Sequence, residues 1–227
     1  MAREIFEQKL QTLQDDVLIL GSMVENALTD SVDILKKRDM IRANRLIAAD
    51  SEINRKRFAI EESTLTFIAT QQPMAGDLRI VASILEIIGE LERIGDYAKG
   101  IAKISVRIGE GGLIKPLVDI PVMAQKAREM LHESLKAFVT QDLELAKDIP
   151  GRDDEVDELY NRVYTDLIEI VIQHPNDKRV FDQITYLLWV AHNLERSADR
   201  VTNICERVMF TITGELVELD GGELVAV

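Results

Sequence analysis

Two copies of one short motif contain the side chains of this sequence that are best suited to bind a cation. Residues 91–96 read LERIGD and residues 194–199 read LERSAD, so a glutamate and an aspartate stand four positions apart in each. Side chains with this spacing lie on one face of a helix. Each copy is preceded by a segment with two more polar groups at the same spacing, Asp50 with Asn54 and Asp153 with Asp157. The candidate metal ligands are Asp50, Glu92, Asp96, Asp153, Asp157, Glu195 and Asp199.

Carboxylates gathered at one place can be stabilised in only a few ways. Like charges repel and burial removes water, so a proton, an arginine or a bound cation must compensate. Asp50 needs such a partner most, because it falls in an otherwise apolar helical series that runs from Leu46 to Phe67. Ligands that are all oxygen suit Mg, Ca, Mn or Fe. The other interpretation is salt bridges on solvated helix faces. The arginines available for them are Arg55, Arg93, Arg196 and Arg200.

Hairpin geometry can bring these groups together. Turns are expected near Met74 and near Pro175. The polar groups lie about 18 to 24 residues from their turn on both sides, which is roughly 27–36 Å along a helix. If the paired helices are antiparallel, carboxylates from two helices converge at one height in each half of the chain.

An enzyme of the ferritin-like type is a further alternative, because such di-metal sites also lie inside helical bundles. They need paired E-x-x-H motifs. The sequence has one, from Glu129 to His132, and we interpret it as an exposed helix turn. His192 beside the second motif is a candidate ligand, whereas His174 precedes Pro175 at an expected helix end. P-loop, dinucleotide-binding and Ser/Cys–His nucleophile patterns are missing from the sequence, so we assign no catalytic residue. A metal-free helical scaffold is the third interpretation.

The elements that must position these groups are long helices. Apolar residues recur at alternating spacings of three and four over residues 3–36, the period of helices packed in a bundle. A third helix is expected to begin at Asp77, which can act as its N-cap, and glycines at 109–112 form a linker. The other helices are expected over 39–71, 121–140, 142–173 and 177–212, with an interruption at Pro150-Gly151.

The second half of the chain repeats the first with a constant offset of 103 residues. The offset aligns the two motifs, and it also aligns Asp39 with Asp142 and Asp50 with Asp153. We therefore predict an all-α fold of six long helices in two tandem three-helix bundles with spectrin-like packing. The predicted bundles comprise residues 1–112 and 113–212. Residues 213–227 form a C-terminal tail, and the sequence does not decide whether this tail is disordered or packs against the helices.

Composition and charge exclude several classes of function. The 227 residues carry 27 basic and 40 acidic side chains, a net charge of −13, whereas contacts with nucleic-acid phosphates need clustered lysine and arginine. We therefore expect no nucleic-acid partner. The longest apolar run is too short to span a bilayer and the charged N-terminus has no signal-peptide core, so we expect a cytoplasmic protein without direct membrane insertion. The single cysteine, Cys205, is expected to be buried and unreactive, and Trp189 to lie in the core or at an interface.

These residues resemble the PhoU family of phosphate-transport regulators. The most specific stretches are DLRI at 77–80 and IGELERIGDYA at 88–98, and HNLERSADR at 192–200 is similar to the second of them. The resemblance covers nearly the whole chain and both repeats. It implies two three-helix bundles and a non-enzymatic cytoplasmic protein that negatively regulates phosphate uptake and the phosphate regulon.

The resemblance also implies partners and a metal. Members of the family act on the phosphate ABC transporter through its ATPase subunit PstB and on the sensor histidine kinase PhoR, and their common dimers imply a homodimer. Some members hold multinuclear iron or zinc clusters on E(D)-x-x-x-D motifs. This role carries over to Glu92, Asp96, Asp153, Asp157, Glu195 and Asp199. For Asp50 the motif is incomplete, because Asn54 replaces the second acid, and Asn193 stands where the first copy has Glu90.

Overall fold

Seven α-helices make up most of the residues that the computed structural model describes, which are 2–220 and 223–225. The long helices are α1 (Ala2–Lys37), α2 (Met40–Gln71), α3 (Gly76–Ile108), α4 (Asp119–Thr140), α6 (Asp153–Gln173) and α7 (Lys178–Thr213). The shorter elements are α5 (Leu143–Asp148), the 3-10 helix η1 (Pro150–Arg152) and the strands β1 (Glu218–Asp220) and β2 (Glu223–Val225). The predicted all-α fold with six long helices is confirmed.

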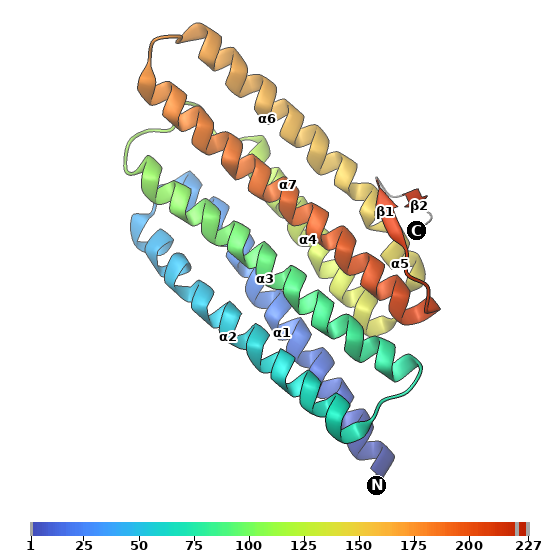
Figure 1. The fold of residues 1–227 in the computed structure, drawn as a ribbon. Coiled ribbons are helices and arrows are strands. Elements are labelled where there is room, and N and C mark those ends of the chain that lie inside the picture. The colour runs from blue at the N-terminus through green and yellow to red at the C-terminus, as the bar shows by residue number, and fades with distance from the viewer. Residues whose placement is uncertain (1, 221–222, 226–227) are drawn as a thin grey trace.

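The long helices lie side by side in two groups of three, and the groups pack against each other (Figure 1). The first group is α1, α2 and α3, and the second is α4, α6 and α7 with the short α5. Between the groups, α3 packs against α7 and α1 packs against α4. Buried apolar side chains from both groups, such as Leu20, Ile84, Leu131 and Leu194, belong to one continuous core. The helices that carry the two acidic motifs, α3 and α7, are therefore also neighbours.

Matching turns set the register of the two copies. The first helix of each half ends at a residue in the left-handed conformation, Arg38 with φ 56° and Gln141 with φ 52°. The next residue is an aspartate that caps the following helix. Asp39 and Asp142 each accept a hydrogen bond from the backbone N–H three residues later, at 2.9 and 3.0 Å. The repeat seen in the sequence therefore extends to the geometry of its turns.

The copies differ where proline interrupts the second helix of the second half. α2 runs unbroken for 32 residues, whereas its counterpart is divided into α5, η1 and α6 at Pro150, which has no backbone N–H to donate. The predicted interruption is confirmed. Ile149, beside the break, is fully buried, while the equivalent Leu46 of α2 is half-buried and lines a groove between α1 and α2.

Two details correct or narrow the sequence-based expectations. Asp77 is not the N-cap of α3, because the helix begins one residue earlier, at Gly76, and follows Ala75, whose side chain has no oxygen to accept a hydrogen bond. Asp77 lies in the first turn instead, where its negative charge still favours the positive end of the helix. Trp189 is 57% exposed, so of its two expected places, the core and an interface, the structure excludes the core.

The C-terminal tail, which the sequence left open, packs on the end of α7. β1 and β2 pair as antiparallel strands, and the Leu219 backbone N–H donates a hydrogen bond to Glu206 of α7 at 2.9 Å. Residues 221–222 and 226–227 of the predicted tail lie outside the described residues. Within the described part of the chain, every helix is too short or too polar to cross a lipid bilayer.

Candidate functional site

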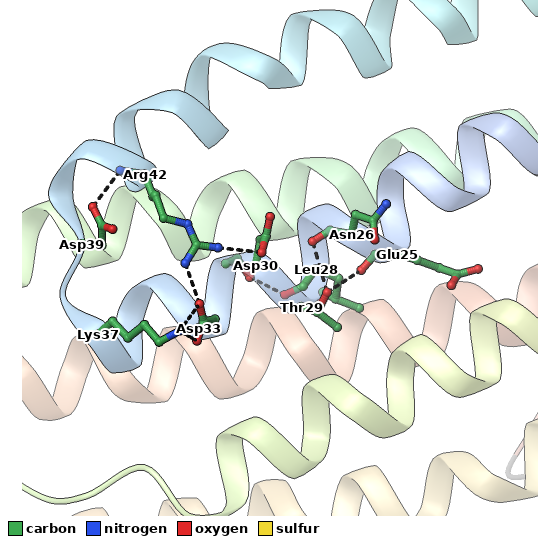
Figure 2. A network of polar contacts seen from close by, with 10 residues as sticks. Glu25, Asn26, Leu28, Thr29, Asp30, Asp33, Lys37, Asp39 and Arg42 are labelled. Carbon is green, nitrogen blue, oxygen red and sulfur yellow. Dashed lines mark hydrogen bonds and ion pairs between the residues drawn. The ribbon is translucent and has the colours of Figure 1, made fainter.

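A polar clamp at the start of α2 fixes the height of Asp50. The Arg42 guanidinium group donates hydrogen bonds to Asp33 at 2.6 Å and to Asp30 at 2.8 Å, both on α1 (Figure 2). Lys37 also binds Asp33, and the hydrogen bonds from Lys37 and Arg42 lower the pKa of this carboxyl group. Because the clamp ties the first turn of α2 to α1, it holds this hairpin in register two turns before Asp50.

The first acidic cluster consists of Asp50 on α2 with Glu92 and Asp96 on α3. Asp50 is only 6% exposed. The Lys99 ammonium group bridges the two helices, with its Nζ 2.6 Å from Asp50 Oδ2 and 3.3 Å from Asp96 Oδ1. Asn54 donates a further hydrogen bond to Asp50 Oδ2 at 3.2 Å. A side-chain cation therefore already compensates the buried carboxylate.

Glu92 is the third carboxylate of this cluster and stands one turn before Asp96. Burial raises the pKa of Glu92, and the charges of Asp96 and, more weakly, Asp50 raise it further. The positive charges of Arg57 and Arg93 act in the opposite direction. The three carboxylates are thus close enough to influence one another, as the hairpin geometry predicts.

The second acidic cluster consists of Asp153 and Asp157 on α6 with Glu195 and Asp199 on α7. Burial raises the pKa of Asp153 to about 7, with further contributions from the charges of Asp199, Asp157 and Glu195. The pKa values of Asp157 and Glu195 are also raised, by burial first and then by Asp199. The structure therefore brings together all four acidic side chains that the sequence assigns to this half.

Two oxygens of the second cluster are buried without a hydrogen bond in the described part of the chain, Asp153 Oδ1 and Glu195 Oε2. His192 Nδ1 lies 3.1 Å from Glu195 Oε2 but does not form a hydrogen bond with it. Buried polar atoms are nearly always paired, so these two oxygens need an explanation. A proton or a bound cation would satisfy them.

Neither cluster is a preassembled metal site. Nowhere in residues 2–220 or 223–225 do three His, Cys, Asp or Glu side chains, as placed, form a group that could hold a metal ion. The donor chemistry of the second cluster still fits a hard or borderline cation, because four carboxylates offer only oxygen and two of the oxygens are unpaired. The first cluster fits such a cation poorly, because Lys99 lies between Asp50 and Asp96.

The arginines considered as salt-bridge partners contribute little to the clusters. Arg55 and Arg93 each pair with a glutamate three residues before them, outside the clusters. Arg196 approaches Asp199, with Nε 3.6 Å from Oδ2. Lys99, the cation that does bind the first cluster, is not among the candidates from the sequence. It follows the aspartate of the first motif by three residues, so helical spacing places it beside Asp96, but its contact with Asp50 depends on how α2 packs against α3.

Glu90, which directly precedes the first motif, joins the two halves of the molecule. From α3 its carboxylate contacts Arg93 at 2.6 Å, and it also reaches Asn203 at 3.2 Å and Arg200 at 3.5 Å on α7. Arg200 Nε is buried and makes no hydrogen bond to any described residue. The change from Glu90 to Asn193 between the two copies therefore bears on this interface.

The remaining residues singled out in the sequence have structural surroundings. His174 is the C-cap of α6, as expected from its place before a proline. Cys205 is buried, and burial raises the pKa of its thiol, which confirms the expectation of an unreactive cysteine. His132 has a side chain that is 67% exposed and lies 3.2 Å from Glu25 of α1. Glu129 is exposed on the same turn, so this E-x-x-H segment is an outer helix face, as interpreted.

Both halves of the chain match the PhoU domain, over residues 17–105 and 120–208. Together the two matches span most of the chain and include both acidic motifs. The chain belongs to the PhoU family. A phosphate-specific transport system accessory protein PhoU homolog from Clostridium acetobutylicum is 37% identical over 221 residues, which are 97% of this chain and 100% of that protein. The phosphate-specific transport system accessory protein PhoU of Escherichia coli is 32% identical over 218 residues, 96% of this chain and 89% of that protein.

Solved PhoU structures share the fold of this chain. The phosphate transport system regulatory protein PhoU from Streptococcus pneumoniae matches with a TM-score of 0.86 and 31% identity, over 94% of this chain and 100% of that one. PhoU from Pseudomonas aeruginosa matches with a TM-score of 0.85 and 29% identity, over 92% and 100% of the two chains. The names of the Clostridium acetobutylicum, Escherichia coli and Streptococcus pneumoniae proteins describe accessory or regulatory proteins of phosphate transport, not enzymes.

Proposed function

We propose that this PhoU-family protein is a cytoplasmic negative regulator of phosphate uptake and of the phosphate regulon. The observation that carries the proposal is the similarity, along nearly the whole chain, to proteins named as accessory parts of phosphate-specific transport. The similarity spans both halves, and so it includes the interfaces between them. A shared fold alone would not support a shared role, but identity above 30% over this length supports both.

The proposed mechanism is reversible docking, with no catalysed reaction. A homodimer of the chain binds the phosphate ABC transporter through its ATPase subunit PstB, and it binds the sensor histidine kinase PhoR. The continuous core supports this mechanism, because helices locked together by buried side chains present rigid faces to a partner. Rigid surfaces lose little conformational freedom on association, which favours binding.

Affinity capture of the full-length chain tests the docking. The tagged chain is expressed in cells grown with ample phosphate and in starved cells, and bound proteins are quantified by mass spectrometry. We expect the transporter ATPase and the kinase to be enriched over an unrelated helical bundle that carries the same tag. Absence of both from both cultures would overturn the proposal. Light scattering tests the homodimer, which should have twice the chain mass of 25.6 kDa.

We also propose that the second acidic cluster binds divalent metal. The candidate ions are iron or zinc in a multinuclear cluster, and Mg, Mn or Ca as single ions. The four carboxylates and the two unpaired buried oxygens support this binding. The competing possibility is a metal-free scaffold in which a shared proton compensates the cluster.

Elemental analysis of the purified chain distinguishes these two possibilities. Asp153→Asn combined with Glu195→Gln should abolish bound metal, while Glu158→Gln, an exposed change on the same helix, should not. The same comparison is repeated after incubation with each candidate ion and removal of the excess. If the unaltered chain retains no ion under any of these conditions, the metal-free scaffold is the correct interpretation.

A further inference from the structure

The internal repeat reveals one charged residue that differs between the two acidic clusters. With the offset of 103 residues, Lys99 of α3 aligns with Thr202 of α7. Lys99 reaches across to α2, where its Nζ lies 2.6 Å from Asp50 Oδ2, and it also contacts Asp96 of its own helix at 3.3 Å. A threonine carries no charge, so the second half has no equivalent of this bridge.

The Lys99 ammonium group would compete directly with a metal ion. A divalent cation that bridged Asp50 and Asp96 would have to lie between the two carboxylates, at 2.0–2.6 Å from an oxygen of each, the range for hard cations. Nζ already occupies that place, because it lies at hydrogen-bonding distance from one oxygen of each carboxylate. Because Lys99 is part of the chain, its local concentration at the site is fixed and high, whereas a free ion must be drawn from solution. Its half-buried position also favours the bridge, since burial weakens the competition from water.

The second acidic cluster lacks this internal cation. Among the described residues, no ion pair involves Asp153 or Asp157, and Asp153 Oδ1 is buried without a partner. The basic side chains that approach the cluster contact its α7 side only, where His192 faces Glu195 and Arg196 faces Asp199. The space between α6 and α7 therefore has carboxylates but no ammonium group.

We propose that Lys99 is the permanent counter-cation of the first acidic cluster and excludes divalent metal from it. The two clusters then differ in the cation that neutralises them, although their acidic residues align in the repeat. This inference deepens the metal binding proposed above. Its test is made with the second cluster blocked, so the outcome does not depend on whether that cluster binds metal or on any docking partner.

The test is Mn²⁺ binding by the full-length chain that carries Asp153→Asn and Glu195→Gln, measured by equilibrium dialysis with detection of free Mn²⁺. With Lys99 present, we expect no saturable binding. Adding Lys99→Thr, which installs the residue of the second half, should create a saturable site for about one Mn²⁺ per chain, with a Kd at least ~10-fold below the highest Mn²⁺ concentration at which the blocked parent shows no saturation. Lys103→Thr is the matched control, because it removes the same charge from an exposed position one turn along α3.

Two outcomes would overturn the proposal. One is saturable Mn²⁺ binding by the blocked parent, and the other is equal binding by the Lys99→Thr and Lys103→Thr chains. Adding Asp50→Asn to the Lys99→Thr chain should remove the new site, and binding that survives this change also counts against the proposal.

Thermal unfolding covers the case in which Lys99→Thr is too unstable to titrate. Ligands that bind only the folded state raise the melting temperature. Mn²⁺ should therefore raise the melting temperature of the Lys99→Thr chain and leave that of the Lys103→Thr chain unchanged. An equal response of the two chains would contradict the assignment.

Discussion

Single-residue differences give the two aligned aspartates, Asp50 and Asp153, opposite electrostatic surroundings. The helix turn after Asp50 carries Asn54, an amide that donates a hydrogen bond to it. The turn after Asp153 carries Asp157, a second carboxylate that repels it. Lys99 adds a positive charge to the first cluster alone. Together these differences leave the first cluster with three carboxylates and one ammonium group, and the second with four carboxylates, so the second needs a proton or an external cation to compensate its charge.

Asp153→Asn should make the metal-free protein more stable at high pH. The pKa of Asp153 is about 7 in the folded chain, against 3.8 as the ordinary value. The folded chain therefore keeps a proton that the unfolded chain releases. The stability that this proton confers is complete below about pH 4 and is lost as the pH rises through 7. We expect the variant to exceed the parent by about 1–2 kcal/mol in free energy of unfolding at pH 8, after allowance for solvent screening, with no difference near pH 4.

Urea denaturation at pH 4, 6 and 8 in the presence of a chelator measures this difference. The matched control is Asp154→Asn, which removes the same charge from the exposed neighbouring residue. A pH dependence shared by the two variants would contradict the assignment of the raised pKa to Asp153.

The acids themselves could be placed from the sequence, but their counter-ions could not. Helix rise is constant, so counting residues from the two turns locates the carboxylates of Asp50, Asp96 and their repeat equivalents. A lysine or arginine, by contrast, has a long side chain that can reach several acids, and its choice depends on the rotation of neighbouring helices. That is why Lys99 went unassigned while Arg93, adjacent to Glu92, was considered first.

At the scale of the elements, the sequence of a segment is enough to predict that it forms a helix, but it is not enough to predict the residue at which the helix begins or ends. The apolar spacing that defines α1 and α2 reflects one buried face per helix, a property of the local sequence. The N-terminus of α3 depends instead on the turn after Pro73, which brings Ala75 to the cap position and leaves Asp77 inside the helix. The interruption at Pro150 could be predicted, because proline lacks the backbone N–H that a helix needs, whatever the surrounding structure.

Glu90→Ala should weaken the packing of α3 against α7. The change leaves Arg200, which is mostly buried, without its carboxylate partner, and an uncompensated buried charge is costly. We expect a loss of about 2 kcal/mol in free energy of unfolding. Glu86→Ala is the control, since it lies one turn earlier on the exposed face of α3. Equal losses in both variants would show that the contact with α7 contributes nothing.

Two glycine substitutions should have opposite effects, because one glycine lies at a helix contact and the other does not. A Cβ added to Gly21 of α1 would lie 2.1 Å from Leu135 Cδ1 of α4, and Leu135 is buried. No described atom outside its own helix lies within 4 Å of a Cβ added to Gly89 of α3. Gly21→Ala should cost about 1–2 kcal/mol by overpacking, whereas Gly89→Ala should gain about 0.5–1 kcal/mol in helix propensity. Chemical denaturation measures both, and stabilisation by Gly21→Ala would show that α1 and α4 can separate at little cost.

At the scale of the whole molecule, the duplication has produced two copies that share one core. Each half buries side chains against the other along α3 and α7 and along α1 and α4. A separated half would therefore expose apolar faces that the intact chain keeps from water. Exposed apolar area costs roughly 25 cal/mol per Å², so the halves should be stable together and weak alone.

Because of this shared core, a substitution that destabilises one half should also lower the stability of the other half. Ile60→Ala empties a buried position on α2, a helix whose main packing partners, α1 and α3, belong to its own half, and it should cost about 2–4 kcal/mol. If the chain unfolds as one unit, hydrogen exchange of the most protected amides of α4 and α7 should accelerate as much as that of α1 and α3. Leu167→Ala, at a buried position on α6, is the matching change in the second half, and it should accelerate exchange in α1 and α3 as much as in α4 and α7. Acceleration confined to the mutated half in both variants would mean that the two copies unfold independently despite their common core.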